Sequence, residues 1–185
     1  MTRSNLHFYF KLILFTVFFW LACGFQTSFW PHLISFLPGP QIWLLLIFFL
    51  ILKWPSLMTV FYIYFLGFSL TQFSQIPLKM VWSTLLITYF LLWTLKSRVQ
   101  LTGVFSFMLY CLIGSFLFQM NYVGLSQLLE KNPTSILFLD RLLQILMNFI
   151  ASYFCYFIFN WLNNRLSQKT DWTQSTSAQK QEYDT

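Results

Sequence analysis

Long uncharged apolar runs dominate the chain, and short stretches with proline, glycine or charged residues separate them. The first run is the clearest, because no Asp, Glu, Lys or Arg lies between Lys11 and Lys53. A helix needs about 20 apolar residues to cross the hydrocarbon core of a bilayer, so such runs predict membrane-spanning helices. The pattern predicts six spans, with ends placed to within several residues, over 10–30, 36–54, 57–75, 79–96, 101–120 and 136–163.

The breaks between the runs contain residues that end helices, because proline lacks a backbone donor and glycine frees the backbone. They fall at 31–40, 54–55, 74–77, 96–98 and, as the longest, 121–135. The run over 79–96 is short, and a re-entrant pair over 68–92 would reduce the number of spans to five. Six spans fit the pattern better.

The predicted fold is therefore all-α: a polytopic integral membrane helix bundle of about six transmembrane helices, formed as one domain by residues 1–165. Residues 166–185 are rich in Gln, Ser and Thr and have no apolar face, which predicts a disordered tail. Composition agrees, since 57% of residues are hydrophobic and only 9% are charged. Soluble domains have about 25% charged residues, which excludes that class.

Basic residues predict the orientation of the chain in the membrane. With a cytoplasmic N-terminus, eight of the eleven Lys and Arg residues fall on the cytoplasmic side. The other three, Lys79, Lys131 and Arg141, fall outside. This bias follows the positive-inside rule and predicts a bacterial inner-membrane protein with both termini in the cytoplasm. The net charge of +6 is spread singly between apolar runs, so we expect no nucleic-acid partner.

The last predicted span carries a row of polar side chains four residues apart. The row consists of Asp140, Gln144, Asn148, Ser152, Tyr156, Asn160 and Asn164. Four residues overshoot a helical turn by about 40°, so only a middle group, Gln144, Asn148 and Ser152, shares one face. This face either binds a partner or substrate, or packs within the bundle, where such hydrogen bonds contribute roughly 0.6–2 kcal/mol each. Packing is the simpler interpretation.

Two small residues mark a second candidate surface in the third predicted span. Gly67 and Thr71 are four residues apart, a spacing that lets two helix backbones approach closely. Sequence motifs for catalysis are not found: there is no HExxH, no GxSxG and no phosphate-binding glycine loop. We therefore expect no enzymatic activity, no cofactor and no metal site.

The chain contains PQIWLLL at 40–46, FLGFSLT at 65–71, IPL at 76–78, KSR at 96–98 and LLQILMN at 142–148. Together these stretches resemble the bacterial rod-shape-determining membrane protein family MreD. Residues 40–46 (PQIWLLL) are similar to the family's proline-led, leucine-rich span. Residues 65–71 (FLGFSLT) and 76–78 (IPL) are similar to its Gly-Leu-Leu-x-Asp segment and following Pro-Leu-Gly. A basic turn, 96–98, stands where the family has one, and 142–148 (LLQILMN) resembles its Gln-x-x-x-Asn helix.

The resemblance covers most of the chain in layout and few positions in identity. Thr71 stands where the family often has Asp, and Lys79 where it often has Gly. The resemblance implies a non-enzymatic component of the cell-elongation machinery, which determines cell shape. Such a protein would be a membrane scaffold that binds an MreC-like partner, and through it MreB filaments and peptidoglycan synthases. Gly67, Thr71, Gln144, Asn148 and Ser152 would form its partner-binding or helix-packing surface.

A second hypothesis is the substrate-binding subunit of an energy-coupling-factor vitamin transporter, which has a similar size and six spans. Its pocket would lie near the outer face, where four polar residues could line one: Gln72, Gln75, Asn121 and Gln127. The Ala-xxx-Ala docking pattern of such subunits is missing, since the first span has only Ala22. A small transporter or channel is a third class, but the spans lack a carboxylate or basic row for an ion pathway.

Overall fold

A computed structural model describes residues 3–73, 77–98, 103–130, 133 and 137–182, with side chains over 9–73, 77–96, 103–130, 133 and 137–165. Its elements are all helical, as the apolar pattern predicts. In chain order they are α1 (Arg3–Gly24), the π-helical turn η1 (Phe25–Phe29), α2 (Trp30–Leu33), α3 (Ile42–Lys53), α4 (Ser56–Leu70), α5 (Leu78–Arg98), α6 (Gly103–Leu129) and α7 (Phe138–Glu182).

Four helical segments of the described chain are long and apolar enough to cross a bilayer. They are Tyr9–Leu33, Leu78–Lys96, Gly103–Leu129 and Phe138–Arg165. This number is compatible with a multi-pass membrane protein. The other two predicted spans correspond to α3 and α4, which have 12 and 15 residues. At 1.5 Å per residue they are about 18 and 23 Å long, short of the roughly 30 Å hydrocarbon core.

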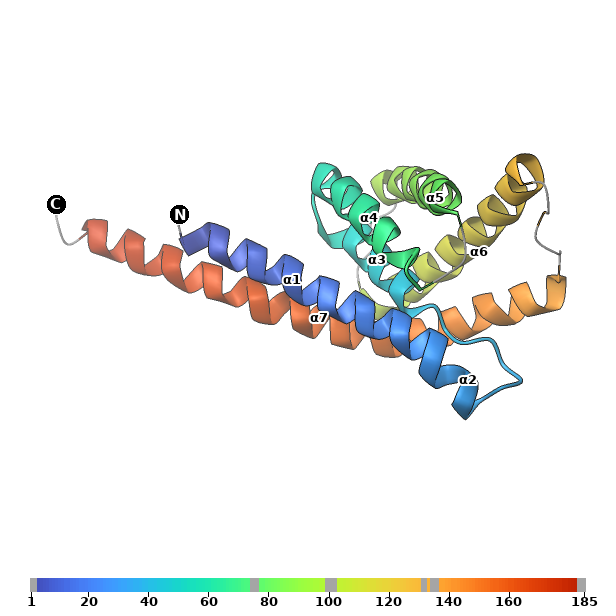
Figure 1. The fold of residues 1–185 in the computed structure, drawn as a ribbon. Coiled ribbons are helices and arrows are strands. Elements are labelled where there is room, and N and C mark those ends of the chain that lie inside the picture. The colour runs from blue at the N-terminus through green and yellow to red at the C-terminus, as the bar shows by residue number, and fades with distance from the viewer. Residues whose placement is uncertain (1–2, 74–76, 99–102, 131–132, 134–136, 183–185) are drawn as a thin grey trace.

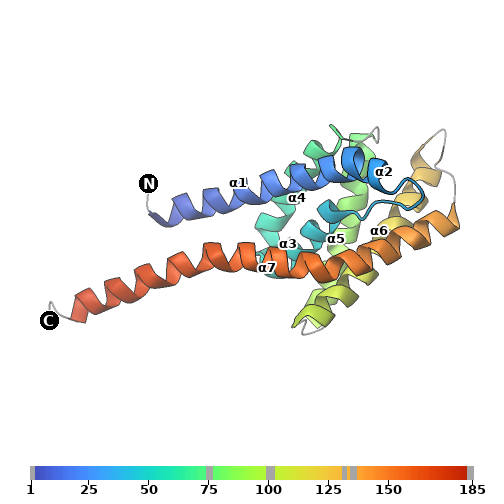
Figure 2. The same cartoon turned by 90° about the horizontal axis from the view of Figure 1, so that it is seen from below.

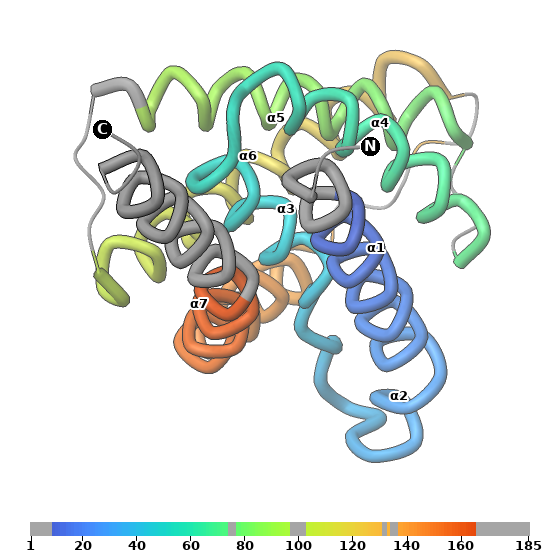
Figure 3. Tube along the Cα trace, turned by 90° about the vertical axis from the view of Figure 1, so that its left-hand side faces the viewer, coloured from blue at the N-terminus to red at the C-terminus, as the bar shows by residue number. Residues whose placement is uncertain are grey.

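The two longest helical stretches at the chain ends run in opposite directions. α1 begins and α7 ends on the same side of the molecule (Figures 1 and 2). The rings of Phe18 in α1 and Phe159 in α7 meet edge to face with centroids 5.5 Å apart. α5 runs crosswise to these two helices and packs against α3, α4 and α6. It is seen nearly along its axis in Figure 1 and from the side in Figure 3.

Helix α3 forms the centre of the core. All nine residues from Trp43 to Ile51 are buried, with exposed fractions of 0–6%. α3 contacts α1, α4, α5, α6 and α7, so no side of it is left for lipid. Its aromatic side chains join the neighbouring helices: the Phe49 ring lies 6.0 Å from that of Phe107 in α6 and 5.4 Å from that of Phe159 in α7. A helix that is apolar all round is expected in such a place.

The outer faces of the long helices are also apolar. Large exposed side chains include Ile13, Val17 and Leu21 of α1 and Ile150, Phe154 and Phe157 of α7. In water such a surface would be costly, because each apolar side chain gains free energy from leaving water. In a bilayer it faces acyl chains.

One predicted boundary needs correction. The break predicted over 121–135 is wrong in its first part, because α6 continues to Leu129. Its polar residues favour a loop by composition, but the Asn121 amide donates to the Thr88 hydroxyl of α5 at 3.1 Å and so packs as part of a helix. The short run over 79–96 lies within the 21-residue α5.

The end of the chain was predicted as a separate tail. α7 extends to Glu182, and residues 183–185 lie outside the described part. The boundary at residue 165 and the disorder of 166–185 stay predictions.

Candidate functional site: a buried polar seam and the cavity beside it

The segment that leads into α3 is not helical. Residues 34–41 separate α2 from α3 and include Pro38, Gly39 and Pro40. The two prolines cannot donate backbone hydrogen bonds, so a regular helix cannot form through them. Non-helical backbone at membrane depth is tolerated only where protein or water satisfies its polar groups.

Two side chains of α7 satisfy this backbone. The Gln144 amide donates to the Gly39 carbonyl. The Asn148 side-chain oxygen accepts from the Gln41 backbone N–H at 2.7 Å. The Asn148 amide nitrogen donates to the Gln41 side-chain oxygen and to the Ser115 hydroxyl of α6, both at 3.1 Å. We call Gly39, Gln41, Ser115, Gln144 and Asn148 the polar seam.

The polar seam caps the central helix from outside. Gln41 stands at the N-cap of α3 without a side-chain capping bond of its own. Asn148, which is fully buried, accepts from the backbone N–H of this N-cap residue, the donor that the N3 side chain of a capping box satisfies in other helices. Its oxygen accepts one hydrogen bond and its nitrogen donates two within the chain, which favours helix packing as the role of this side chain.

The other predicted site residues lie elsewhere. Ser152 is fully buried and donates to the Phe149 carbonyl of its own helix at 2.6 Å. A methyl group added at Gly67 would come within 2.7 Å of the Trp82 side chain of α5, so glycine permits close contact of α4 with α5. Thr71 donates to the Phe68 carbonyl at the end of α4. Of the five residues, Gln144 and Asn148 share a site.

The opposite end of α3 is held by lysine. The Lys96 ammonium of α5 donates to the Ile51 carbonyl at 2.8 Å. A cation at a helix C-terminus is favoured, because the last carbonyls lack helical donors and carry partial negative charge. The Lys11 ammonium lies 5.6 Å from the Trp54 ring centroid nearby. In the sequence, both lysines indicate topology, and neither position reveals a contact with the end of α3.

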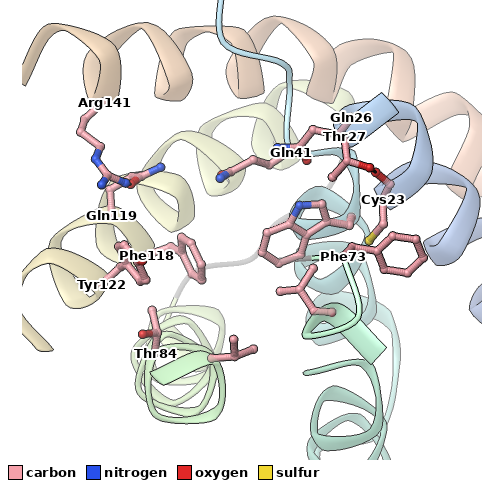
Figure 4. A pocket seen from close by; sticks show the side chains of 13 residues that line it. Cys23, Gln26, Thr27, Gln41, Phe73, Thr84, Phe118, Gln119, Tyr122 and Arg141 are labelled. Atoms are coloured by element: carbon pink, nitrogen blue, oxygen red, sulfur yellow. Dashed lines mark hydrogen bonds between the residues drawn. The ribbon is translucent and has the colours of Figure 1, made fainter. Parts of the chain in front are cut away.

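A cavity of about 260 Å³ lies beside the start of α3 (Figure 4). Seven elements and the residues just before α3 and just after α4 contribute to its wall, which consists of Cys23, Gln26, Thr27, Gln41, Trp43, Leu70, Phe73, Val81, Thr84, Phe118, Gln119, Tyr122 and Arg141. Arg141 is its cationic group. Its guanidinium donates to the Gln119 side-chain oxygen at 2.6 Å and lies 5.4 Å from the Tyr122 ring centroid.

Two polar atoms of the wall are buried without a hydrogen-bond partner in the described part of the chain. They are the Thr84 hydroxyl and the Gln26 side-chain oxygen. Thr84 is fully buried. Leaving such a group unpaired costs about 1–3 kcal/mol, so the pair marks places where water or a ligand would be stabilised.

The transporter hypothesis expected a pocket lined by other residues. Asn121 bonds to Thr88, Gln72 and Gln127 are exposed, and Gln75 lies outside the described residues. The cavity instead uses Gln26, Gln41 and Gln119, single amides inside apolar runs. In the sequence, the sign of this cavity was that each of these glutamines stands alone among apolar residues.

Among the residues with described side chains, no three His, Cys, Asp or Glu groups lie close enough together to hold a metal ion.

Comparisons of the chain with protein-family models, with curated proteins and with solved structures found no match.

Proposed function

We propose that this protein is a non-enzymatic scaffold of the bacterial inner membrane that belongs to the cell-elongation machinery. It would bind an MreC-like protein, and through it MreB filaments and peptidoglycan synthases. The proposal rests on the resemblance to the MreD family in residues 40–46, 65–78 and 142–148.

One observation carries the proposal. The resemblance was drawn from stretches far apart in the sequence, and two of them bond directly, since Gln41 and Asn148 share two hydrogen bonds. Gly67, within the third stretch, packs against Trp82, which follows that stretch in α5. If the similarity to the family had arisen by chance, these distant stretches would not be expected to contact each other. Their contacts support a shared bundle plan.

The proposal includes six passages through the membrane, with α3 and the segment before it as the second. The lysine contacts support this. Lys96 reaches the C-terminal end of α3 and Lys11 lies over Trp54, so this end of α3 lies level with basic residues of α1 and α5. The non-helical residues 34–41 then cover the depth that a 12-residue helix leaves uncovered.

The scaffold surface would be the apolar exterior. The polar groups of the seam are engaged inside the bundle, and the exposed faces of α1 and α7 carry large apolar side chains. Helices associate in lipid through close packing, so a partner's membrane helix would replace lipid on such a face.

The cavity favours a second candidate, the substrate-binding subunit of a vitamin transporter. Depletion of the protein in a rod-shaped bacterial host distinguishes the two candidate functions. The scaffold function predicts that cells round and swell before growth stops. Cells that keep their width but require an added vitamin would contradict the scaffold and support the transporter subunit. Recovery by the wild-type gene is the control.

A further inference from the structure

The cavity beside α3 combines a cation, unpaired polar groups and aromatic rings. We propose that it binds a small molecule with an anionic group, which the Arg141 guanidinium receives while the apolar part packs against Trp43, Phe73 and Phe118. This inference goes beyond the scaffold proposal and deepens the second candidate by naming the charge of its ligand. Its test measures binding, so it can fail or succeed independently of cell shape.

Arg141 is available to an anion. Its two contacts, the Gln119 amide oxygen and the Tyr122 ring, are both neutral. A guanidinium has five N–H donors in a planar fork, and this fork matches a carboxylate or phosphate. In Figure 4 the Arg141 and Gln119 side chains meet at one end of the cavity wall.

Two carboxylates lie near this cation and limit what it can bind. Asp140 lines an adjoining hollow together with Arg141 and is exposed. Glu130 accepts from the Ser126 hydroxyl of its own segment at 2.6 Å. Neither lines the cavity itself. Because water screens an exposed charge, the Asp140 carboxylate repels a bound anion only weakly. It does not take the anion's place beside Arg141.

The unpaired polar atoms define further features of the ligand. The Gln26 side-chain oxygen only accepts, so it requires a donor such as a hydroxyl or amine. The Thr84 hydroxyl can donate or accept. Figure 4 places Gln26 and Thr84 on different sides of the cavity, so a ligand that reaches both would extend across it.

The size of the cavity limits the ligand to a small molecule. A volume of about 260 Å³ equals the liquid volume of roughly nine waters. It lies near the lower end of ligand pockets, which begin at about 300 Å³. A ring with one anionic and one donor group is of this order. The anionic group could belong to a free molecule or to a lipid headgroup, and the experiment separates these sources.

The test uses the full chain in nanodiscs of phosphatidylcholine. 4-Hydroxybenzoate is the probe, and 4-hydroxybenzamide is a neutral probe of the same shape. We expect the carboxylate to bind saturably by titration calorimetry and to raise the melting temperature, and the amide to bind at least tenfold more weakly. Nanodiscs of phosphatidylglycerol without probe test the lipid source. A rise in melting temperature there that depends on Arg141 would assign the anion to a headgroup.

Two variants locate the binding. Arg141→Gln should weaken binding of 4-hydroxybenzoate about ten- to a hundredfold, the range for a lost hydrogen bond to a charged group. Lys53→Gln removes a cation at the far end of α3 and should leave binding unchanged. Asp140→Asn should strengthen binding or leave it unchanged.

Thr84→Val tests the cavity if Arg141→Gln fails to fold. Removing an unpaired buried hydroxyl should raise the melting temperature of the ligand-free protein and weaken binding of the probe several-fold. The proposal is overturned if the carboxylate and the amide bind equally, if neither the probe nor phosphatidylglycerol acts through Arg141, or if Thr84→Val leaves probe binding unchanged.

Discussion

The side-chain oxygen of Asn148 accepts a hydrogen bond from the Gln41 backbone N–H at 2.7 Å, although 107 positions separate the two residues. The bond ties the last helix to the beginning of the central one. With the Gln144 amide on the Gly39 carbonyl, it satisfies backbone groups that neither lipid nor their own segment can satisfy.

Replacing Asn148 with Leu should therefore destabilise the bundle. The substitution leaves the Gln41 N–H, the Gln41 amide oxygen and the Ser115 hydroxyl without this partner. We expect a loss of about 1–3 kcal/mol, measured by melting in mild detergent. Asn164→Leu, at an exposed position of the same row, is the control and should melt like the wild type.

The same samples distinguish the two interpretations of the polar row. If Asn148 acts through packing, capture of an MreC-like protein declines only in proportion to folded protein. Normal melting with reduced capture would instead make Asn148 a partner-binding residue and contradict the buried contacts.

Two glycines of α6 provide a matched pair. A methyl group at Gly114 would lie 2.8 Å from the ring of the buried Phe48, whereas nothing lies within 4 Å at Gly124. Gly114→Ala should cost about 1–3 kcal/mol by overpacking, as the shift in melting reports. Gly124→Ala should be neutral or slightly stabilising, since alanine favours the helix. Equal effects would refute the close contact of α3 with α6.

The contact of Lys96 with the end of α3 predicts a smaller effect. Lys96→Gln loses the bond to the Ile51 carbonyl and should lower the free energy of unfolding by about 0.3–1 kcal/mol. Lys79→Gln, an exposed lysine in the first turn of the same helix, is the control. A larger loss for Lys79→Gln would argue against this capping role.

Cysteine labelling distinguishes six passages from four. The six-passage proposal puts the turn between α3 and α4 on the cytoplasmic side, because it lies near Lys11 and Lys96. Ser56→Cys should then react with a membrane-impermeant maleimide only after cells are permeabilised. The three native cysteines are buried, so the unmodified chain is the background control. Labelling of intact cells at Ser56→Cys would favour four passages.

The helices could be predicted from the sequence because a long apolar run by itself indicates a segment that is surrounded by lipid or by protein. The polar row was visible too, since Gln144 and Asn148 interrupt an apolar helix at a regular spacing. Their partners were not, because local periodicity does not say which segment faces a helix. Only the structure shows that Pro38 to Gln41 lie against α7, and that single amides such as Gln26 and Gln119 meet at one cavity.

The polar seam has a consequence for the synthesis of the chain. A ribosome adds about 5–20 residues per second, so Gln41 emerges about 5–20 s before Asn148. During that interval the carbonyl of Gly39 and the N–H of Gln41 lack the side chains that satisfy them in the finished protein. If α3 is the second of six passages, as proposed above, we expect it to reach its final position only when the last helix arrives. In nascent chains arrested before residue 138, Pro40→Cys should be open to labelling that the complete chain excludes, because residue 40 is buried there.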